Sequence, residues 1–197
     1  IIATKASPHH HTPEGLRAAC EQSLQNLQTD WIDVYQLHWP NRDVPFAETW
    51  GAMQELIAEG KVRVGGVSNF GPGDLDELLA SGHPDVNQLA YNLLFRAIEF
   101  EIQPLCVEQQ ISILCYSPLA QGLLTGKFST PDEVPAGRAR TRHFSSQREL
   151  ARHGEPGAEA ETFAAIAQIR AVAEELGVPM HHLALAWLLR QPGVACV

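Results

Sequence analysis

The sequence predicts an α/β fold in which the strands of a parallel sheet alternate with helices. Short apolar runs and segments of helical periodicity follow one another along the chain, a pattern typical of βα units. Hydrophobic residues make up 45 % of the 197 residues, which suffices for one core. The helical segments also begin and end at residues that favour helix caps. We therefore expect a single domain over residues 1–197.

The strands are predicted from short apolar runs that end at turn residues. Apolar residues follow one another almost without interruption in these runs, as expected for strands buried on both faces of a parallel sheet. The predicted strands are Ile1–Lys5, Ile32–His38, Val62–Ser68, Val86–Tyr91, Ile111–Ser117 and Gly193–Val197.

The first helix has the clearest boundaries. Thr12 is a candidate N-cap, Pro13 suits the first helical position and Glu14 lies in the first turn. Leu16, Cys20, Leu24 and Leu27 then form an apolar stripe of helical period. A second helix carries Phe46, Trp50, Met53, Leu56 and Ile57 and ends at Gly60. Further helices are expected at 75–79, 105–109, 160–176 and 181–189.

Residues 129–158 form a long polar segment without a clear secondary-structure element. They contain Pro131, Pro135, Gly137 and Pro156, many charges and few large apolar groups. A segment of this length is usually functional or mobile. Two interpretations stay open, a lid and a surface loop.

The composition argues against several classes of partner. The net charge of −9 disfavours nucleic acid and anionic membranes as partners. No apolar stretch is long enough to span a bilayer, and the chain opens on strand-like IIATK rather than a signal peptide. Four scattered cysteines are expected to be buried free thiols. These features predict a cytoplasmic protein.

Two polar residues are expected at the carboxyl ends of strands. His38 ends the run IDVYQLH, and Pro40 stops it. Lys5 shares a strand face with Ile1 and Ala3. The residues alone leave two alternatives. Either both residues have a chemical role, or His38 is a structural histidine and Lys5 is a solvated lysine.

A resemblance narrows these alternatives. The segments HTPEGLRAACEQSLQNLQTDWIDVYQLHWP (11–40), GKVRVGGVSNF (60–70), VNQLAYNLLFR (86–96) and YSPLAQGLLTGKF (116–128) resemble the aldo-keto reductases in order and spacing. The resemblance implies an incomplete (β/α)8 TIM barrel containing about strands three to eight. A complete barrel needs about 250 residues. We therefore expect a fragment whose open sheet edges make the isolated chain poorly stable.

The resemblance implies that Lys5 and His38 are catalytic. In the family, the lysine pairs with an aspartate and lowers the pKa of a proton-donating tyrosine, and the histidine orients the carbonyl oxygen. The tyrosine and aspartate are expected before Ile1. Tyr35 should point away from His38 because their offset is odd.

The resemblance also implies a nicotinamide cofactor, NADPH by family preference with NADH as the alternative. The implied contacts are Ser68, Asn69 and Gln88 with the carboxamide, Tyr116 with the ring, and Ser117, Leu119, Gln121, Gly122 and Leu124 with the pyrophosphate. The bland alternatives are turn chemistry for Ser68 and Asn69 and a core role for Tyr116. No GxGxxG motif occurs, so a Rossmann module is not indicated.

Other charged or metal-binding residue types carry weaker signals. His9, His10 and His11 follow the first strand, but we expect no metal site there. Arg138, Arg140 and Arg142 in the long polar segment could meet substrate or cofactor phosphates, with solvated charge as the default.

Three functional hypotheses follow. The leading one is an oxidoreductase that interconverts aldehydes or ketones and alcohols by hydride transfer, with a small-molecule carbonyl or alcohol substrate. The second is a non-catalytic cofactor-binding subunit or an inactive fragment of the same fold; an upstream aspartate and tyrosine would favour the enzyme instead. The third, a zinc hydrolase using His9 and His11, predicts bound metal in a metal assay.

Overall fold

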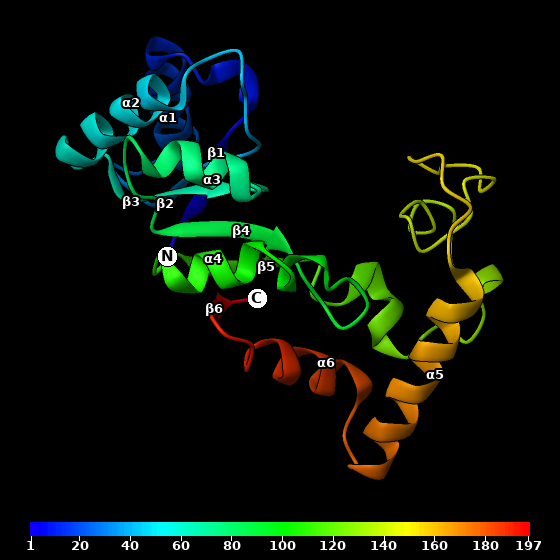
Figure 1. The fold of residues 1–197 in the computed structure, drawn as a ribbon. Helices are drawn as coiled ribbons and strands as arrows, with labels where there is room; N and C mark the ends of the chain where they lie inside the picture. Colours follow the sequence, from blue (N-terminus) through cyan, green and yellow to red (C-terminus); the bar gives the residue numbers. More distant parts are fainter. The chain divides into compact units, whose positions relative to one another are not determined.

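The computed structural model describes all 197 residues and contains one parallel sheet (Figure 1). Its six strands follow one another in chain order. The strands are β1 (Ala3–Ala6), β2 (Ile32–Leu37), β3 (Val62–Ser68), β4 (Val86–Ala90), β5 (Ser112–Tyr116) and β6 (Val194–Cys196). Strands and helices alternate through β5, so the predicted α/β class is confirmed.

Six helices accompany the strands. They are α1 (Pro13–Leu27), α2 (Phe46–Ala58), α3 (Pro72–Leu79), α4 (Ile102–Glu108), α5 (Glu159–Glu175) and α6 (Met180–Leu188). Short 3₁₀ helices cover Pro8–His10, Ala97–Glu99, Ala120–Thr125 and Pro131–Glu133. The predicted cap of α1 is confirmed, because the Thr12 side chain accepts a hydrogen bond from the Gly15 amide. The fourth helix begins at Ile102 rather than at Leu105.

The chain divides into two compact units, which we describe separately. The sheet unit comprises Ile1–Leu89, Ile98–Cys115 and Pro192–Cys196. The helical unit comprises Ala90–Ala97, Tyr116–Gln191 and Val197.

The two faces of the sheet differ at consecutive glycines of β3. A Cβ on Gly65 would lie 3.1 Å from Met53 and Ile57 of α2, so this face is packed by the helix. A Cβ on Gly66 would overlap Val86 of β4 and lie 3.3 Å from the Gln36 Cγ. The face that carries Gly66 and Gln36 is therefore the one turned away from α2, and on a barrel it is the inner face.

The outer helices of the sheet unit bury their apolar stripes. Leu16 and Cys20 of α1 are fully buried, as predicted, whereas Leu27 at its end is 42 % exposed. Arg17 of α1 donates hydrogen bonds to Glu55 and Glu59 at the carboxyl end of α2, which joins the two helices at the surface.

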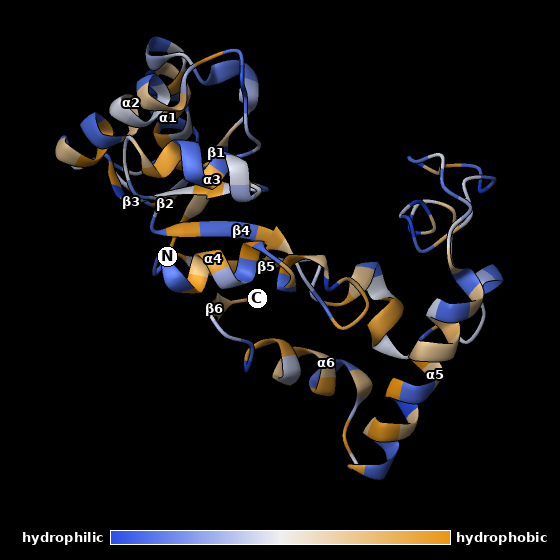
Figure 2. Ribbon diagram, viewed as in Figure 1, coloured by the Kyte–Doolittle hydropathy of each residue, from blue (hydrophilic) through white to orange (hydrophobic).

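The helical unit has a core of its own. Val134, Ala139 and Phe144 lie within the long polar segment 129–158 and pack with Phe163 and other apolar residues of the unit. The helix α5 alternates between hydrophobic and hydrophilic residues along its length (Figure 2). The segment thus contributes buried side chains despite its polar composition.

Arg148 ties the long polar segment to the start of α5. Its guanidinium donates to both carboxylate oxygens of Glu159, at 2.9 and 2.8 Å, and to Asp132 at 3.0 Å. This bidentate pairing holds the pKa of Glu159 below its ordinary value.

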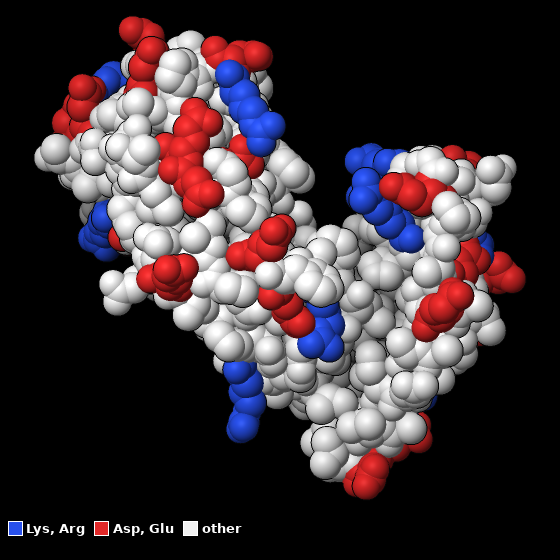
Figure 3. Space-filling view, in the orientation of Figure 1, with Lys and Arg blue, Asp and Glu red and all other residues white.

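The surface charges and the cysteines bear on the expectations drawn from composition. Acidic groups are spread over the face shown in Figure 3 rather than gathered in one patch. None of the helices is both long and apolar enough to cross a membrane. None of the four cysteines forms a disulfide, but Cys196 is exposed, which corrects the expectation that all are buried. Cys196 lies in the short strand β6, where neighbouring residues are also exposed.

Candidate functional site

The strand register places several predicted site residues on one face of the sheet unit. Lys5 pairs in register with Gln36, Gln36 with Gly66, and Ser68 with Gln88. Residues in register on parallel strands point to the same side, and so do residues two positions apart. Lys5 therefore shares the inner face with Ser68 and Gln88, one level below them.

His38 follows β2 two residues beyond Gln36 and continues the same face. Its backbone amide donates to the Ala6 carbonyl at 2.9 Å, so it lies directly beside the end of β1. The side chain is exposed, and its ring lies 6.5 Å from the ring of Trp39. The backbone of His38 is thus fixed by a hydrogen bond, while its imidazole ring is accessible to a small molecule.

Lys5 is half-buried one level below His38. Burial lowers the pKa of its ammonium group, because removal from water disfavours the charged form. A nearby anion or hydrogen-bond acceptor would stabilise the charged form of this lysine.

Asn69 joins the ends of three strands. Its Nδ2 donates to the His38 carbonyl at 3.1 Å and to the Ser68 Oγ at 3.0 Å. Its backbone amide and the Ser68 hydroxyl both donate to the Gln88 carbonyl, at 3.0 and 2.9 Å. The φ angle of Asn69 is +62°, a left-handed conformation that asparagine tolerates better than most residues. The structure therefore brings His38, Ser68, Asn69 and Gln88 together through backbone and side-chain hydrogen bonds.

Tyr35 lies on the opposite face of β2, which confirms that it points away from His38. It pairs in register with Thr4, is fully buried near Cys20 of α1, and its hydroxyl has no hydrogen-bond partner. Burial raises the pKa of its phenol. Tyr35 is thus unsuited to proton transfer on the face that holds Lys5.

The remaining predicted site residues belong to the helical unit, whose segment Tyr116–Gln191 begins at Tyr116. Tyr116 ends β5, is half-buried and has its phenol pKa raised by burial. Its carbonyl accepts from the Tyr91 amide at 3.4 Å. Ser117 has a φ of +54°, and its carbonyl accepts from the Asn92 Nδ2 at 3.0 Å. Asn92 thereby fastens the start of the loop.

The loop after Ser117 folds back on itself. Gln121 and Gly122 both have left-handed backbones, with φ of +55° and +101°. The amides of Gly122 and Leu124 donate to the Leu119 carbonyl, at 2.9 and 3.2 Å. Leu124 is fully buried in the core of the helical unit. Any contact between Leu124 and a ligand would therefore involve its backbone rather than its side chain.

Arg138 is the arginine that the structure brings next to this loop. Its Nη1 lies 3.0 Å from the position that a Cβ on Gly122 would occupy, and its side chain is exposed. Solvated charge was the default expectation for Arg138, with contact to substrate or cofactor phosphates as the alternative. The residue pattern alone did not indicate that Arg138 lies beside Gly122.

The histidine run after β1 has a structural contact. His11 is buried, and its Nε2 lies 3.4 Å from the Ala6 carbonyl. Burial lowers its pKa. The ring centroids of His9 and His10 lie 4.0 Å apart on a 3₁₀ helix, and the ring planes are tilted by 49°. No group of three or more His, Cys, Asp or Glu side chains is arranged to hold a metal ion.

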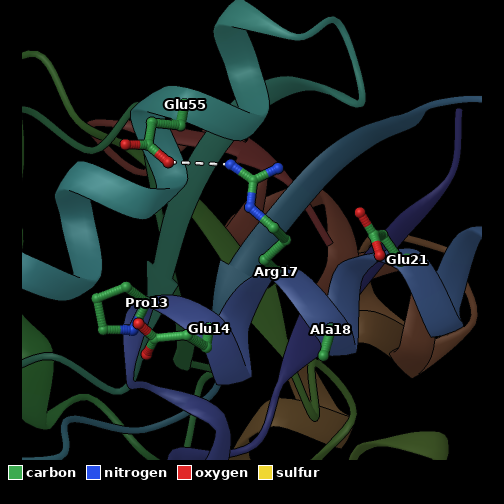
Figure 4. A pocket seen from close by; sticks show the side chains of 6 residues that line it. All are labelled: Pro13, Glu14, Arg17, Ala18, Glu21 and Glu55. Carbon is green, nitrogen blue, oxygen red and sulfur yellow. Dashed lines mark hydrogen bonds and ion pairs between the residues drawn. The ribbon is translucent and has the colours of Figure 1, made fainter.

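A surface pocket of about 420 Å³ lies elsewhere, over α1 and α2 (Figure 4). Arg17 reaches from α1 toward Glu55 across it, and Glu14 and Glu21 also line it. None of the predicted site residues lines this pocket.

Comparison with known proteins agrees with these features. The model of the family described as "Aldo/keto reductase family" matches residues 1–197. The chain is 38 % identical over 184 residues to the NADH-specific methylglyoxal reductase of Escherichia coli, covering 91 % of this chain and 53 % of that protein. It is 41 % identical over 126 residues to the glyoxal reductase of Bacillus subtilis, covering 63 % of this chain and 45 % of that protein. The chain spans about half the length of the curated relatives it matches.

Solved structures show the same relationship. An aldo/keto reductase from Klebsiella pneumoniae in complex with NADP and acetate has a TM-score of 0.74 and 30 % identity, and the match covers 100 % of this chain and 58 % of that one. The glycerol dehydrogenase AKR11B4 from Gluconobacter oxydans has a TM-score of 0.82 and 30 % identity over 95 % of this chain and 55 % of that one. The six parallel strands in chain order are thus part of a (β/α)8 barrel, which confirms the predicted fold.

Proposed function

Because the chain belongs to the aldo/keto reductase family, we propose that the full-length protein interconverts aldehydes or ketones and alcohols by hydride transfer with a nicotinamide cofactor. The single observation that carries the proposal is the shared face of Lys5 and His38 at the carboxyl ends of adjoining parallel strands. Active sites of (β/α)8 barrels lie at this end of the strands.

The residues present fit a nicotinamide cofactor. Ser68, Asn69 and Gln88 supply hydroxyl and amide groups of the kind that a carboxamide requires, and they are fixed by hydrogen bonds across strand ends. In the helical unit, Arg138 beside Gly122 offers a guanidinium of the kind that binds phosphate. Tyr116 offers a ring for stacking. When bound, the cofactor supplies or accepts the hydride.

Lys5 and His38 have separate tasks in this proposal. The His38 ring, exposed at the strand end, orients the carbonyl oxygen and stabilises the negative charge that develops on it. The Lys5 ammonium favours the anionic form of a neighbouring acid and so lowers the pKa of the group that donates the proton. The family resemblance assigns that donor to a tyrosine, and Tyr35 is excluded by its position on the α1 side.

Small dicarbonyls are the first substrates to test. One relative is named a methylglyoxal reductase and another a glyoxal reductase. NADPH is proposed as cofactor because related structures hold NADP or NADPH, and NADH stays the alternative because one relative is NADH-specific. The free cysteines are consistent with our further proposal of a cytoplasmic location.

The test follows cofactor oxidation by the full-length protein with methylglyoxal or glyoxal. We expect His38→Ala to lower turnover while the cofactor still quenches tryptophan fluorescence. His182→Ala, at an exposed histidine near the start of α6, is the matched control and should retain turnover. Unchanged turnover in His38→Ala would remove the role assigned to His38. Cofactor binding without any turnover in the unmodified protein would favour a non-catalytic subunit.

A further inference from the structure

Gln36 is a buried polar residue that none of the roles above uses. Its side chain is fully buried in the middle of β2, and neither Oε1 nor Nε2 has a hydrogen-bond partner. Leaving a buried amide unsatisfied is costly, so a partner in the functional state is expected. Leucine or valine would fill the same place without this cost.

The position of Gln36 identifies its neighbour. Gln36 is the register partner of Lys5, so the two side chains lie at one level of the inner face. On the other side, the register partner of Gln36 is Gly66, which has no side chain, and a Cβ there would lie 3.3 Å from the Gln36 Cγ. The glycine leaves room for the glutamine, and Lys5 offers the charged group nearest to it in the register.

Few other titratable groups face this level. On β2, His38 is two residues beyond Gln36 on the same face, whereas Asp33 and Tyr35 point to the opposite one. Asp33 is paired there with Arg63 of β3. An ammonium has three donors and no acceptor, and the Gln36 Oε1 is an acceptor without a donor.

From this juxtaposition we propose that Gln36 is a positioning residue whose Oε1 accepts a hydrogen bond from the Lys5 Nζ and fixes the ammonium beneath the substrate. This inference rests on the proposed function for its catalytic meaning. Burial already disfavours the charged form of Lys5, so an amide acceptor at the same level keeps the lysine protonated and aimed. The Nε2 group stays available to a second acceptor.

The test measures the pKa of Lys5 directly in the full-length protein. Lysine side-chain carbons are labelled, and the Lys5 signal is identified by NMR from its loss in Lys5→Met. Gln36→Met removes both polar atoms at similar volume and should lower the Lys5 pKa by about one unit, because a hydrogen bond to a charged group is being lost. Gln36→Glu keeps the acceptor and adds a negative charge, so it should raise the Lys5 pKa.

Two controls separate positioning from general disturbance. Tyr35→Phe removes a buried hydroxyl from the adjacent residue of β2 on the opposite face and should leave the Lys5 pKa unchanged. The Lys61 signal, from a lysine paired with Glu21 and Glu59, should not move in any variant. Gln36→Met should also lower turnover by about tenfold at saturating cofactor, with cofactor affinity retained.

The outcomes are distinct. Opposite shifts in the two Gln36 variants with none in Tyr35→Phe support the proposal. If neither Gln36 variant shifts the Lys5 pKa, or if Tyr35→Phe shifts it equally, Gln36 has no positioning role. If Gln36→Met does not fold, Gln36→Glu alone decides by its upward shift or lack of one. The titration needs no turnover, so a protein without reductase activity would defeat the proposed function and leave this coupling measurable.

Discussion

The sheet unit and the helical unit hold their polar residues in different ways. In the sheet unit, strand register determines which side chains share a face, so Lys5 and Ser68 are aligned by backbone pairing alone. In the helical unit, left-handed residues such as Gln121 and Gly122 and the packing around Phe144 shape the loop. Regular pairing therefore fixes side chains at defined levels of one face, whereas the position of the loop residues depends on local backbone conformation and packing.

The largest expected effect is on the chemistry of the sheet unit. In the full-length protein, Lys5→Met should lower turnover by about 10²- to 10⁴-fold, the usual contribution of acid–base catalysis, because the proton donor loses its activating charge. Cofactor affinity, measured by fluorescence titration, should be retained. Lys61→Met removes a lysine engaged in surface ion pairs and should keep full turnover. Equal losses of turnover in both variants would contradict the separation.

The next effect is on the core of the helical unit. Phe144 is 1 % exposed, and Phe144→Ala should lower the free energy of unfolding by about 3–5 kcal/mol through lost burial and a cavity. Hydrogen exchange should accelerate in α5 more than in β2. Phe100→Ala removes a ring that is 84 % exposed and should change stability by less than about 0.5 kcal/mol. Protection lost equally in β2 and α5 would show that the units do not open separately.

A smaller effect is expected at the loop. An alanine at the Gly122 φ of +101° is strained by about 1–3 kcal/mol, and its Cβ would crowd the Arg138 guanidinium. Gly122→Ala should therefore weaken cofactor binding by about tenfold while turnover at saturating cofactor stays close to normal. Gly137→Ala, with open space around its Cβ and no positive φ, is the matched control. Identical affinities in the two variants would argue against a cofactor role for the loop.

The smallest effect is electrostatic. Arg148 lowers the Glu159 pKa below its ordinary value of 4.5, so the ionised carboxylate stabilises the fold fully when the pH is above 4.5. This contribution is lost as the pH falls from 4.5 through the lowered pKa. Glu159→Gln should lower the free energy of unfolding by less than about 1 kcal/mol at neutral pH, since the pair is partly exposed. At a pH below the lowered pKa of Glu159, the substitution should leave the free energy of unfolding unchanged. Urea unfolding at both pH values measures this.

The control for that variant is Glu161→Gln, which lies in the same first turn of α5. It shares the helix-dipole contribution but lacks the arginine. An equal pH-dependent loss in Glu161→Gln would assign the effect to the helix terminus instead of to Arg148.

The sequence predicted the sheet unit better than the helical unit for a physical reason. Apolar runs and alternation are local properties, so β3 was predicted over Val62–Ser68 as observed, and the faces of Lys5 and Tyr35 followed from parity. The resemblance then pointed to Ser68 and Asn69, but the hydrogen bonds that link them across strands required the structure.

The helical unit depends on contacts that leave no periodic trace. Val134, Ala139 and Phe144 are irregularly spaced in a polar segment, so their burial could not be anticipated. Arg138 approaches Gly122 from a later part of the chain, and the neighbouring Gln121 has a left-handed backbone that this residue type rarely adopts. The unsatisfied amide of Gln36 was equally hidden, because a glutamine inside an apolar strand gives no sign of its partners.

The most direct test of the division between the two units measures turnover and the cofactor dissociation constant side by side in Lys5→Met and Gly122→Ala. We expect Lys5→Met to lose turnover with an unchanged dissociation constant, and Gly122→Ala to bind cofactor more weakly with nearly normal turnover at saturation. If both variants lost the same quantity, the assignment of chemistry to Lys5 and of cofactor binding to the loop around Gly122 would be contradicted.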